Sequence, residues 1–179
     1  MENLILEAIN GNELAFDKLI ISIEKDLYKI ARMRLNYEED IEDAVQETII
    51  QVYRNIPKVK QPQYFKTWVV RILINNCNKI YKKNLLEKKV QYNENFVEEY
   101  KYIQNDERIE NIDFYMLIRE LKYKERIVII LYYLCGFTTK QIGKILRIPE
   151  STVKTRMNRA RRKLKNTFKG GADYERNRQ

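Results

Sequence analysis

A short stretch near the end of the chain, STVKTRMNRARRKLK at residues 151–165, carries seven basic residues and no acidic residue. Guanidinium and ammonium groups at this density neutralise phosphates, and arginine and lysine also donate hydrogen bonds to the edge of guanine. The whole chain has a formal net charge of +9, which favours an acidic partner. Nucleic acid and an anionic membrane surface both fit that charge.

If residues 151–165 form a single helix, their apolar residues share one side and their polar residues share the other. Four apolar residues recur at i, i+4, i+7 and i+11, which forms one buried stripe on a helix: Val153, Met157, Ala160 and Leu164. Seven polar residues lie opposite this stripe or on its flanks: Ser151, Lys154, Thr155, Arg156, Asn158, Arg159 and Arg162. Such a helix can hold its first turns against base edges in a major groove, while Arg161, Arg162 and Lys163 neutralise phosphates.

A second, shorter helix is predicted just before the basic one. Thr138 with Gln141 three residues later is typical of a capping box, and apolar residues follow at Ile142, Ile145 and Leu146. Residues 147–149 then interrupt the helix. A charge run is usually a solvated face, but the matched preceding helix and the tight turn favour a helix-turn-helix that binds duplex DNA.

Acidic residues dominate a separate stretch, since residues 38–47 hold six acids and no base. Five residues at helical spacing predict its buried stripe: Ile41, Val45, Thr48, Val52 and Ile56. The predicted exposed side carries Asp40, Asp43, Gln46 and Glu47. Such a face can be merely solvated and favoured by the helix N-terminus, or it can bind a basic protein, and these residues alone support both interpretations.

Aromatic, amide and basic residues are mixed along residues 61–84, QPQYFKTWVVRILINNCNKIYKKN, beside a loop bounded by two prolines. Proteins that bind single-stranded nucleic acid need this mixture, because rings stack on bases and cations neutralise the backbone. Phe65 and Trp68 have near-helical spacing and are predicted to be core residues instead. Tyr64, Asn75 and Lys79 are the predicted exposed residues.

Glycine and proline are scarce, at five and three residues, and no strand alternation is evident, so an all-α fold is predicted. The charge also changes sign along the chain. Residues 54–89 hold ten Lys/Arg against one Glu, whereas residues 90–113 hold seven Asp/Glu against two Lys/Arg. These changes predict a helical domain at residues 1–86, an acidic linker at 87–112, a second helical domain at 113–169 and a flexible tail at 170–179.

No metal or catalytic constellation is present in the sequence. It has no histidine, its cysteines Cys77 and Cys135 have no paired spacing, and it has no glycine-rich phosphate loop. We therefore expect no catalytic residue, no metal, no cofactor and no small-molecule substrate. The chain starts without a signal-peptide pattern, and its longest apolar run of nine residues is too short to span a bilayer, which predicts a cytoplasmic protein.

Three segments, in this order, resemble the bacterial extracytoplasmic-function sigma factors: DIEDAVQETIIQVYRNI, YFKTWVVRILINNCNKIYKK and GFTTKQIGKILRIPESTVKTRMNRARRKL. With their flanks they cover nearly the whole chain. The resemblance implies a non-catalytic subunit that binds RNA polymerase core, directs it to a promoter and helps to open the duplex. It places sigma region 2 at residues 1–86 and sigma region 4 at residues 113–169. It also implies an anti-sigma factor as a partner, which in this family often holds the sigma factor at the membrane.

The resemblance assigns residues of the first domain to two contacts. Asp43, Gln46 and Glu47 match the residues that dock on the clamp helices of the largest polymerase subunit, where carboxylates meet arginine and lysine. Asn75 matches a reader of an extruded base in the melted minus-ten promoter element. The exposed Tyr64 and Lys79 are expected to join it in binding minus-ten DNA.

In the second domain the resemblance concerns the duplex minus-thirty-five element. Lys154, Thr155 and Arg159 match base-reading positions. Arg156, Arg161 and Arg162 are expected to bind the phosphate backbone. Ser151 and Asn158, on the same predicted helix face, complete the expected contact surface.

Two other functions would use some of the same surfaces. An autonomous helix-turn-helix regulator would bind duplex DNA without polymerase, but it leaves the DAVQE sequence unexplained. A membrane-surface protein would need a helix whose apolar face is free to enter lipid, whereas the apolar stripe of the basic helix is expected to pack on a partner helix.

Overall fold

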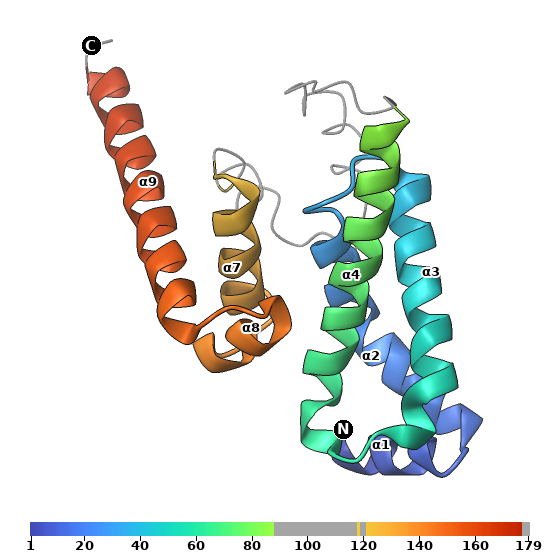
Figure 1. Cartoon of the computed structure of the whole chain (residues 1–179). Coiled ribbons are helices and arrows are strands. Elements are labelled where there is room, and N and C mark those ends of the chain that lie inside the picture. Colours follow the sequence, from blue (N-terminus) through green and yellow to red (C-terminus); the bar gives the residue numbers. More distant parts are fainter. Residues whose placement is uncertain (88–117, 119–120, 177–179) are drawn as a thin grey trace. The chain divides into compact units, whose positions relative to one another are not determined.

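The computed structural model describes residues 1–87, 118 and 121–176, with residues 166–176 as backbone only (Figure 1). All regular structure in these residues is helical, which confirms the predicted all-α fold. The chain divides into two compact units, Met1–Arg108 and Ile109–Gln179. The predicted acidic linker lies outside the described residues except for Glu87.

The described residues of the first unit, 1–87, form four α-helices. α1 spans Glu2–Ile9, α2 spans Glu13–Ala31, α3 spans Glu38–Asn55 and α4 spans Phe65–Leu86. The proline-bounded loop between α3 and α4 forms two short 3-10 turns, Ile56–Lys58 and Pro62–Tyr64. In Figure 1, α2, α3 and α4 run alongside one another, while α1 lies across one end of them.

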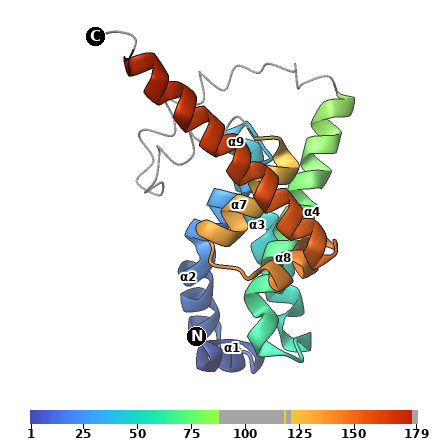
Figure 2. The same ribbon diagram turned by 90° about the vertical axis from the view of Figure 1, so that its left-hand side faces the viewer.

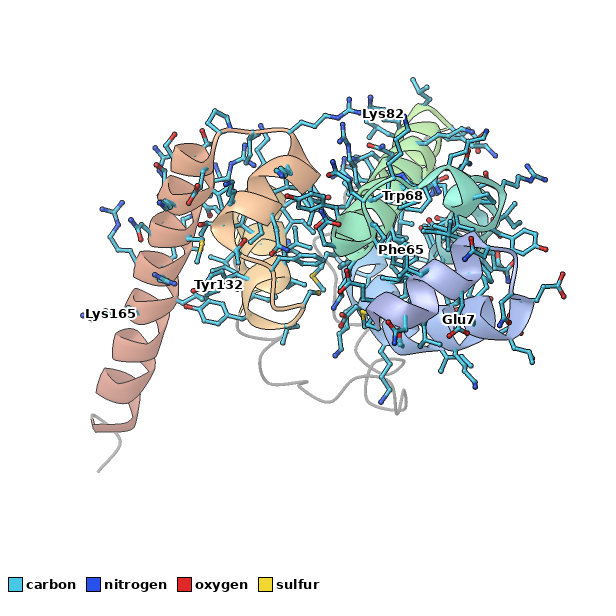
Figure 3. All side chains as sticks on the ribbon, turned by 90° about the horizontal axis from the view of Figure 1, so that it is seen from below. Glu7, Phe65, Trp68, Lys82, Tyr132 and Lys165 are labelled. Carbon is cyan, nitrogen blue, oxygen red and sulfur yellow. The ribbon has the colours of Figure 1, made fainter. Side chains whose placement is uncertain are left out.

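The core of this unit forms where the apolar stripes of these helices meet. All five residues of the predicted α3 stripe are buried: Ile41, Val45, Thr48, Val52 and Ile56. Leu19 and Leu27 of α2 and Phe65 and Leu73 of α4 supply the opposing side chains. Phe65 is buried as predicted, and its ring lies 5.9 Å from that of Trp68, which is half-buried (Figure 3). Removing these side chains from water stabilises the unit.

The second unit contains α7 at Tyr123–Tyr133, α8 at Thr139–Leu146 and α9 at Glu150–Arg176. The predicted capping box starts α8, because the Thr138 side chain accepts from the Gln141 backbone and the Gln141 side chain accepts from the Thr138 backbone. Arg147 then ends α8 in the left-handed conformation, with φ 54°. This short turn leads directly into α9 and completes a helix-turn-helix.

The long helix α9 packs on α7 and α8 through its apolar stripe. Val153, Met157 and Ala160 are buried and Leu164 is half-buried, as the helical spacing predicts. The helix continues through both glycines at 170 and 171 to Arg176, past the predicted start of the tail at residue 170. Glycine lowers helix propensity without forbidding the conformation, so two glycines need not end a helix. Figure 2 shows α9 as the longest continuous element of this unit.

Gly143 fixes the distance between α8 and the turn that follows it. A Cβ at this position would lie 2.9 Å from the carbonyl oxygen of Ile148, and the Ile148 backbone N–H donates to the Gly143 carbonyl at 3.0 Å. We expect Gly143→Ala to destabilise the second unit by on the order of 1–2 kcal/mol, because the clash exceeds the gain in helix propensity. Thermal unfolding measured by circular dichroism checks this, with Lys140→Ala on the exposed side of α8 as the control. Equal midpoints for Gly143→Ala and the wild type would contradict the close approach.

Candidate functional site

The polar face of α9 is open to solvent. Six of the seven polar residues predicted for it are exposed and Arg156 is half-buried: Ser151, Lys154, Thr155, Asn158, Arg159 and Arg162. The Thr155 hydroxyl donates to the Ser151 carbonyl at 2.9 Å, which leaves its oxygen able to accept a hydrogen bond. The face therefore offers short polar groups in its first turns and guanidinium groups in the next ones, an arrangement suited to base edges followed by phosphates.

Two basic residues of α9 that the sequence suggested for phosphate contacts are engaged with α7. Arg161 Nε donates to the Tyr133 hydroxyl at 3.0 Å, and its guanidinium lies 5.7 Å from the Tyr133 ring centre and 6.0 Å from that of Tyr132. Lys163 Nζ forms an ion pair with Glu125 at 2.8 Å. Figure 3 shows Tyr132 beside α9. These contacts give Arg161 and Lys163 a part in packing α9 on α7, which the spacing along α9 alone did not indicate.

Glu150, the first residue of α9, is an acid that the sequence reasoning did not single out. Its carboxylate accepts a hydrogen bond from Thr139 Oγ1 of α8 at 2.7 Å and pairs with Lys154 Nζ at 3.0 Å. The Thr139 hydrogen bond, and then the Lys154 contact, lower the pKa of Glu150 below its ordinary value. The i, i+4 spacing of Glu150 and Lys154 was the sequence signal that could have found the pair.

The acidic face of α3 is exposed at all three residues expected to contact polymerase. Asp43, Gln46 and Glu47 are exposed, and Glu47 accepts a hydrogen bond from Gln51 Nε2 at 2.7 Å. Asp40, which the sequence placed on this exposed side, is half-buried and accepts from Asn84 Nδ2 of α4 at 2.6 Å. The helix periodicity could not show that α4 covers this end of the acidic stripe.

The opposite kind of charge lies on α4, which contains five Lys/Arg and no acid. Asn75 and Lys79 are exposed one turn apart, so the two side chains share one face of the helix. Tyr64 is exposed at the N-terminal end of α4. Lys66 pairs with Asp26 of α2 at 2.6 Å, which engages one of the five cations within the unit. Lys82 points outward toward solvent (Figure 3).

A polar network between α3 and α4 lies beneath these two faces. Asn76 is buried, and its Nδ2 donates to Thr48 Oγ1 at 3.0 Å while its Oδ1 accepts from Gln51 Nε2 at 3.4 Å. The Thr48 hydroxyl in turn donates to the Ala44 carbonyl at 2.6 Å. The network fixes the register of α4 against α3, and Asn75 directly precedes Asn76. The exposed asparagine is therefore held at a defined position relative to the acidic face.

The described residues contain neither a metal-binding group nor a helix fit to cross a membrane. No cluster of three or more His, Cys, Asp or Glu side chains among them could hold a metal ion. None of their helices combines the length and the apolar character that a membrane span requires. Both cysteines are free and buried, and burial raises the pKa of the Cys77 thiol to about 12. Cys77 is therefore a protonated core residue.

Comparison with known proteins identifies both units. The Sigma-70 region 2 family model matches residues 19–85, and the Sigma-70, region 4 model matches residues 112–164. The ECF RNA polymerase sigma factor SigW of Bacillus subtilis is 28% identical over 92% of this chain and 97% of the relative. The ECF RNA polymerase sigma factor SigM of Mycobacterium tuberculosis is 24% identical over 90% of this chain and 81% of the relative. The chain belongs to the extracytoplasmic-function sigma factors of the sigma-70 family.

Solved structures share the fold of this sigma factor. CnrH in complex with the cytosolic domain of CnrY matches with a TM-score of 0.69 at 22% identity, covering 94% of this chain and 97% of that one. The sigma factor RpoE of Bartonella quintana, in complex with the anti-sigma factor NepR, matches with a TM-score of 0.65 at 20% identity, covering 86% and 96%. The family-model matches lie one in each unit, so the first unit carries region 2 and the second carries region 4.

Family membership decides between the functions that the sequence left open. A sigma factor directs RNA polymerase to promoters, and it does so as an initiation factor rather than as an enzyme. An autonomous helix-turn-helix regulator would account for region 4 alone. The match of region 2 to residues 19–85, which include the DAVQE sequence, favours the sigma factor over that alternative.

Proposed function

We propose that this sigma factor binds RNA polymerase core through the acidic face of α3, with Asp43, Gln46 and Glu47 as its contacts. All three side chains are exposed, while the other side of α3 is buried in region 2, so binding needs no unfolding. Carboxylates on a rigid helix suit a surface of arginine and lysine, where charge-assisted hydrogen bonds are stronger than neutral ones. The cationic partner surface would belong to the polymerase.

The DNA contacts divide between the two units. The basic helix α4 would hold the melted minus-ten element, with Asn75 reading an extruded base and Tyr64 and Lys79 beside it. The exposed face of α9 would read the duplex minus-thirty-five element. Its contact residues would be Ser151, Lys154, Thr155, Arg156, Asn158, Arg159 and Arg162.

The strongest support for the proposal is the separation of charge between two packed helices. α3 exposes acids while α4, which packs on it, carries only basic charged residues. A protein that bound nucleic acid with all of region 2 would repel it with α3. Two partners of opposite charge, a protein on α3 and DNA on α4, account for both faces.

The same proposal extends to location and control. With RNA polymerase core and promoter DNA as its partners, the sigma factor would act in the cytoplasm, without catalysing a reaction and without a cofactor or small-molecule substrate. The neighbouring structures of CnrH with CnrY and of RpoE with NepR support an anti-sigma factor as a further partner. Such a partner could hold this sigma factor at the membrane until a signal releases it.

Two arginines of α9 are expected to contribute in different ways. Arg159→Ala should cost on the order of 1–3 kcal/mol in binding the minus-thirty-five element and relax the preference at one base pair, because a base contact is lost. Arg162→Ala should weaken binding to all sequences alike and flatten the salt dependence, because a phosphate contact is lost. Binding of the polymerase complex to duplexes with single-base changes, measured at several salt concentrations, checks both.

A matched control is Lys124→Ala, which removes one exposed positive charge from α7 instead of α9. Lys124→Ala should leave the base preference unchanged, and it should change the salt dependence of binding only slightly. If Arg159→Ala and Arg162→Ala alter specificity equally, the division between base contact and phosphate contact is contradicted.

A further inference from the structure

The ion pair at the start of α9 differs from an ordinary surface pair because its acid is also attached to a second helix. Glu150 forms an ion pair with Lys154 of α9 and also accepts a hydrogen bond from the hydroxyl of Thr139, the first residue of α8. An isolated exposed pair leaves both side chains free to move. Here the hydrogen bond from Thr139 ties the carboxylate to α8, so the ammonium of Lys154 is drawn toward the junction of the two helices.

We infer that Glu150 is a positioning residue that makes Lys154 a reader of a base edge rather than a mobile phosphate contact. The inference rests on the proposed role of α9 at the minus-thirty-five element. A lysine ammonium has three N–H donors, so one can remain on Glu150 while the others reach guanine O6 and N7. Without the carboxylate, the flexible lysine would follow the strong negative potential of the phosphates, whose contacts carry no sequence information.

The charge of Glu150 also affects where the first turn of α9 can lie. Unpaired backbone N–H groups and the helix dipole make a helix N-terminus attractive to phosphate. An ionised carboxylate in that turn opposes a phosphate there, and Glu150 is ionised at neutral pH as an ordinary glutamate is. The first turn is then directed toward base edges, where Ser151 and Lys154 are exposed.

The experiment uses the full-length sigma factor bound to RNA polymerase core and a library of DNA duplexes randomised across the minus-thirty-five element. Bound and unbound duplexes are sequenced for the wild type, Glu150→Gln, Lys154→Ala and the double variant. Glu125→Gln is the matched control, because Glu125 also pairs with a lysine of α9, Lys163, at 2.8 Å. Gln keeps an oxygen that can accept from Thr139, and circular dichroism checks that each variant is folded.

Glu150→Gln is expected to lower the preference at the base pair read by Lys154 by at least about fivefold, the lower end for one good base contact. It should also steepen the dependence of log affinity on log salt by up to about 0.9, as for one added phosphate contact. Lys154→Ala should remove the same base preference, and the double variant should show no additional loss. Glu125→Gln should leave every base preference unchanged.

Several results would overturn the inference. An unchanged preference in folded Glu150→Gln would show that Lys154 needs no positioning. A further loss of base preference when Glu150→Gln is added to Lys154→Ala would mean that Glu150 acts on the DNA by another route. If the wild-type complex enriches no sequence at all, the proposed role of α9 fails together with the inference, and this outcome is distinct from the other two.

Discussion

Replacing Asp43 and Glu47 together by lysine is expected to lower the affinity for RNA polymerase core by at least about 100-fold, equivalent to about 3 kcal/mol. Each substitution removes a carboxylate of α3 that would face a cationic surface of the polymerase. The lysine that replaces it carries a positive charge, which that surface repels. Both residues are exposed and neither belongs to the buried stripe of α3, so region 2 should stay folded. Equilibrium binding of labelled sigma factor to purified core measures the effect.

The matched control for this charge reversal is Glu2→Lys with Asp17→Lys. These two acids are exposed on α1 and α2, and their replacement changes the net charge by the same amount. The control pair should bind core nearly as well as the wild type. Equal weakening by both double variants would show a response to net charge, and core affinity unchanged by Asp43→Lys with Glu47→Lys would remove α3 from the interface.

Asn75→Ala is expected to leave core binding and minus-thirty-five binding intact while reducing open-complex formation by roughly tenfold to 100-fold. The range corresponds to about 1–3 kcal/mol for losing a hydrogen bond to a base that has left the stack. Asn75 is exposed on α4, so the substitution creates no cavity in the core. Permanganate footprinting of the melted promoter region measures the open complex directly.

A promoter with a pre-melted bubble should partly rescue Asn75→Ala, because unpairing a base costs a few kcal/mol that the bubble has already supplied. Asn36→Ala, an exposed asparagine between α2 and α3, is the control and should melt duplex DNA normally. Normal melting of duplex DNA by Asn75→Ala would refute the assignment. Failure of both variants to bind core would instead point to a folding defect.

Local patterns along the chain were sufficient to predict the helices and most of their orientation. The capping box at Thr138, the α9 stripe of Val153, Met157 and Ala160, and the stripe of α3 all depend on residues within a few turns of one another. Such features follow from the 3.6-residue period of the helix and from unpaired groups at helix ends. The acidic face of α3 and the basic face of α9 were predictable for the same reason.

Features that depend on contacts between helices could not be predicted in this way. Asp40 has the spacing of the exposed acidic face, yet Asn84, 44 positions further along the chain, covers it. Arg161 lies among residues suited to phosphates, yet it donates to Tyr133 of α7. Asn75 was predicted to be exposed, but no local pattern indicated that the polar Asn76 would be buried between α4 and α3 with Thr48 as its hydrogen-bond partner. Which helix covers which face is decided by tertiary packing.

Transcription reconstituted from purified components shows whether this sigma factor directs RNA polymerase to promoters. RNA polymerase core is incubated with genomic DNA fragments, with and without this sigma factor, and the 5′ ends of the transcripts are sequenced. We expect core alone to start at no defined site, and added sigma factor to produce defined start sites whose use is lost with Asp43→Lys and Glu47→Lys together. Specific DNA binding by the chain without any core-dependent initiation would contradict this expectation.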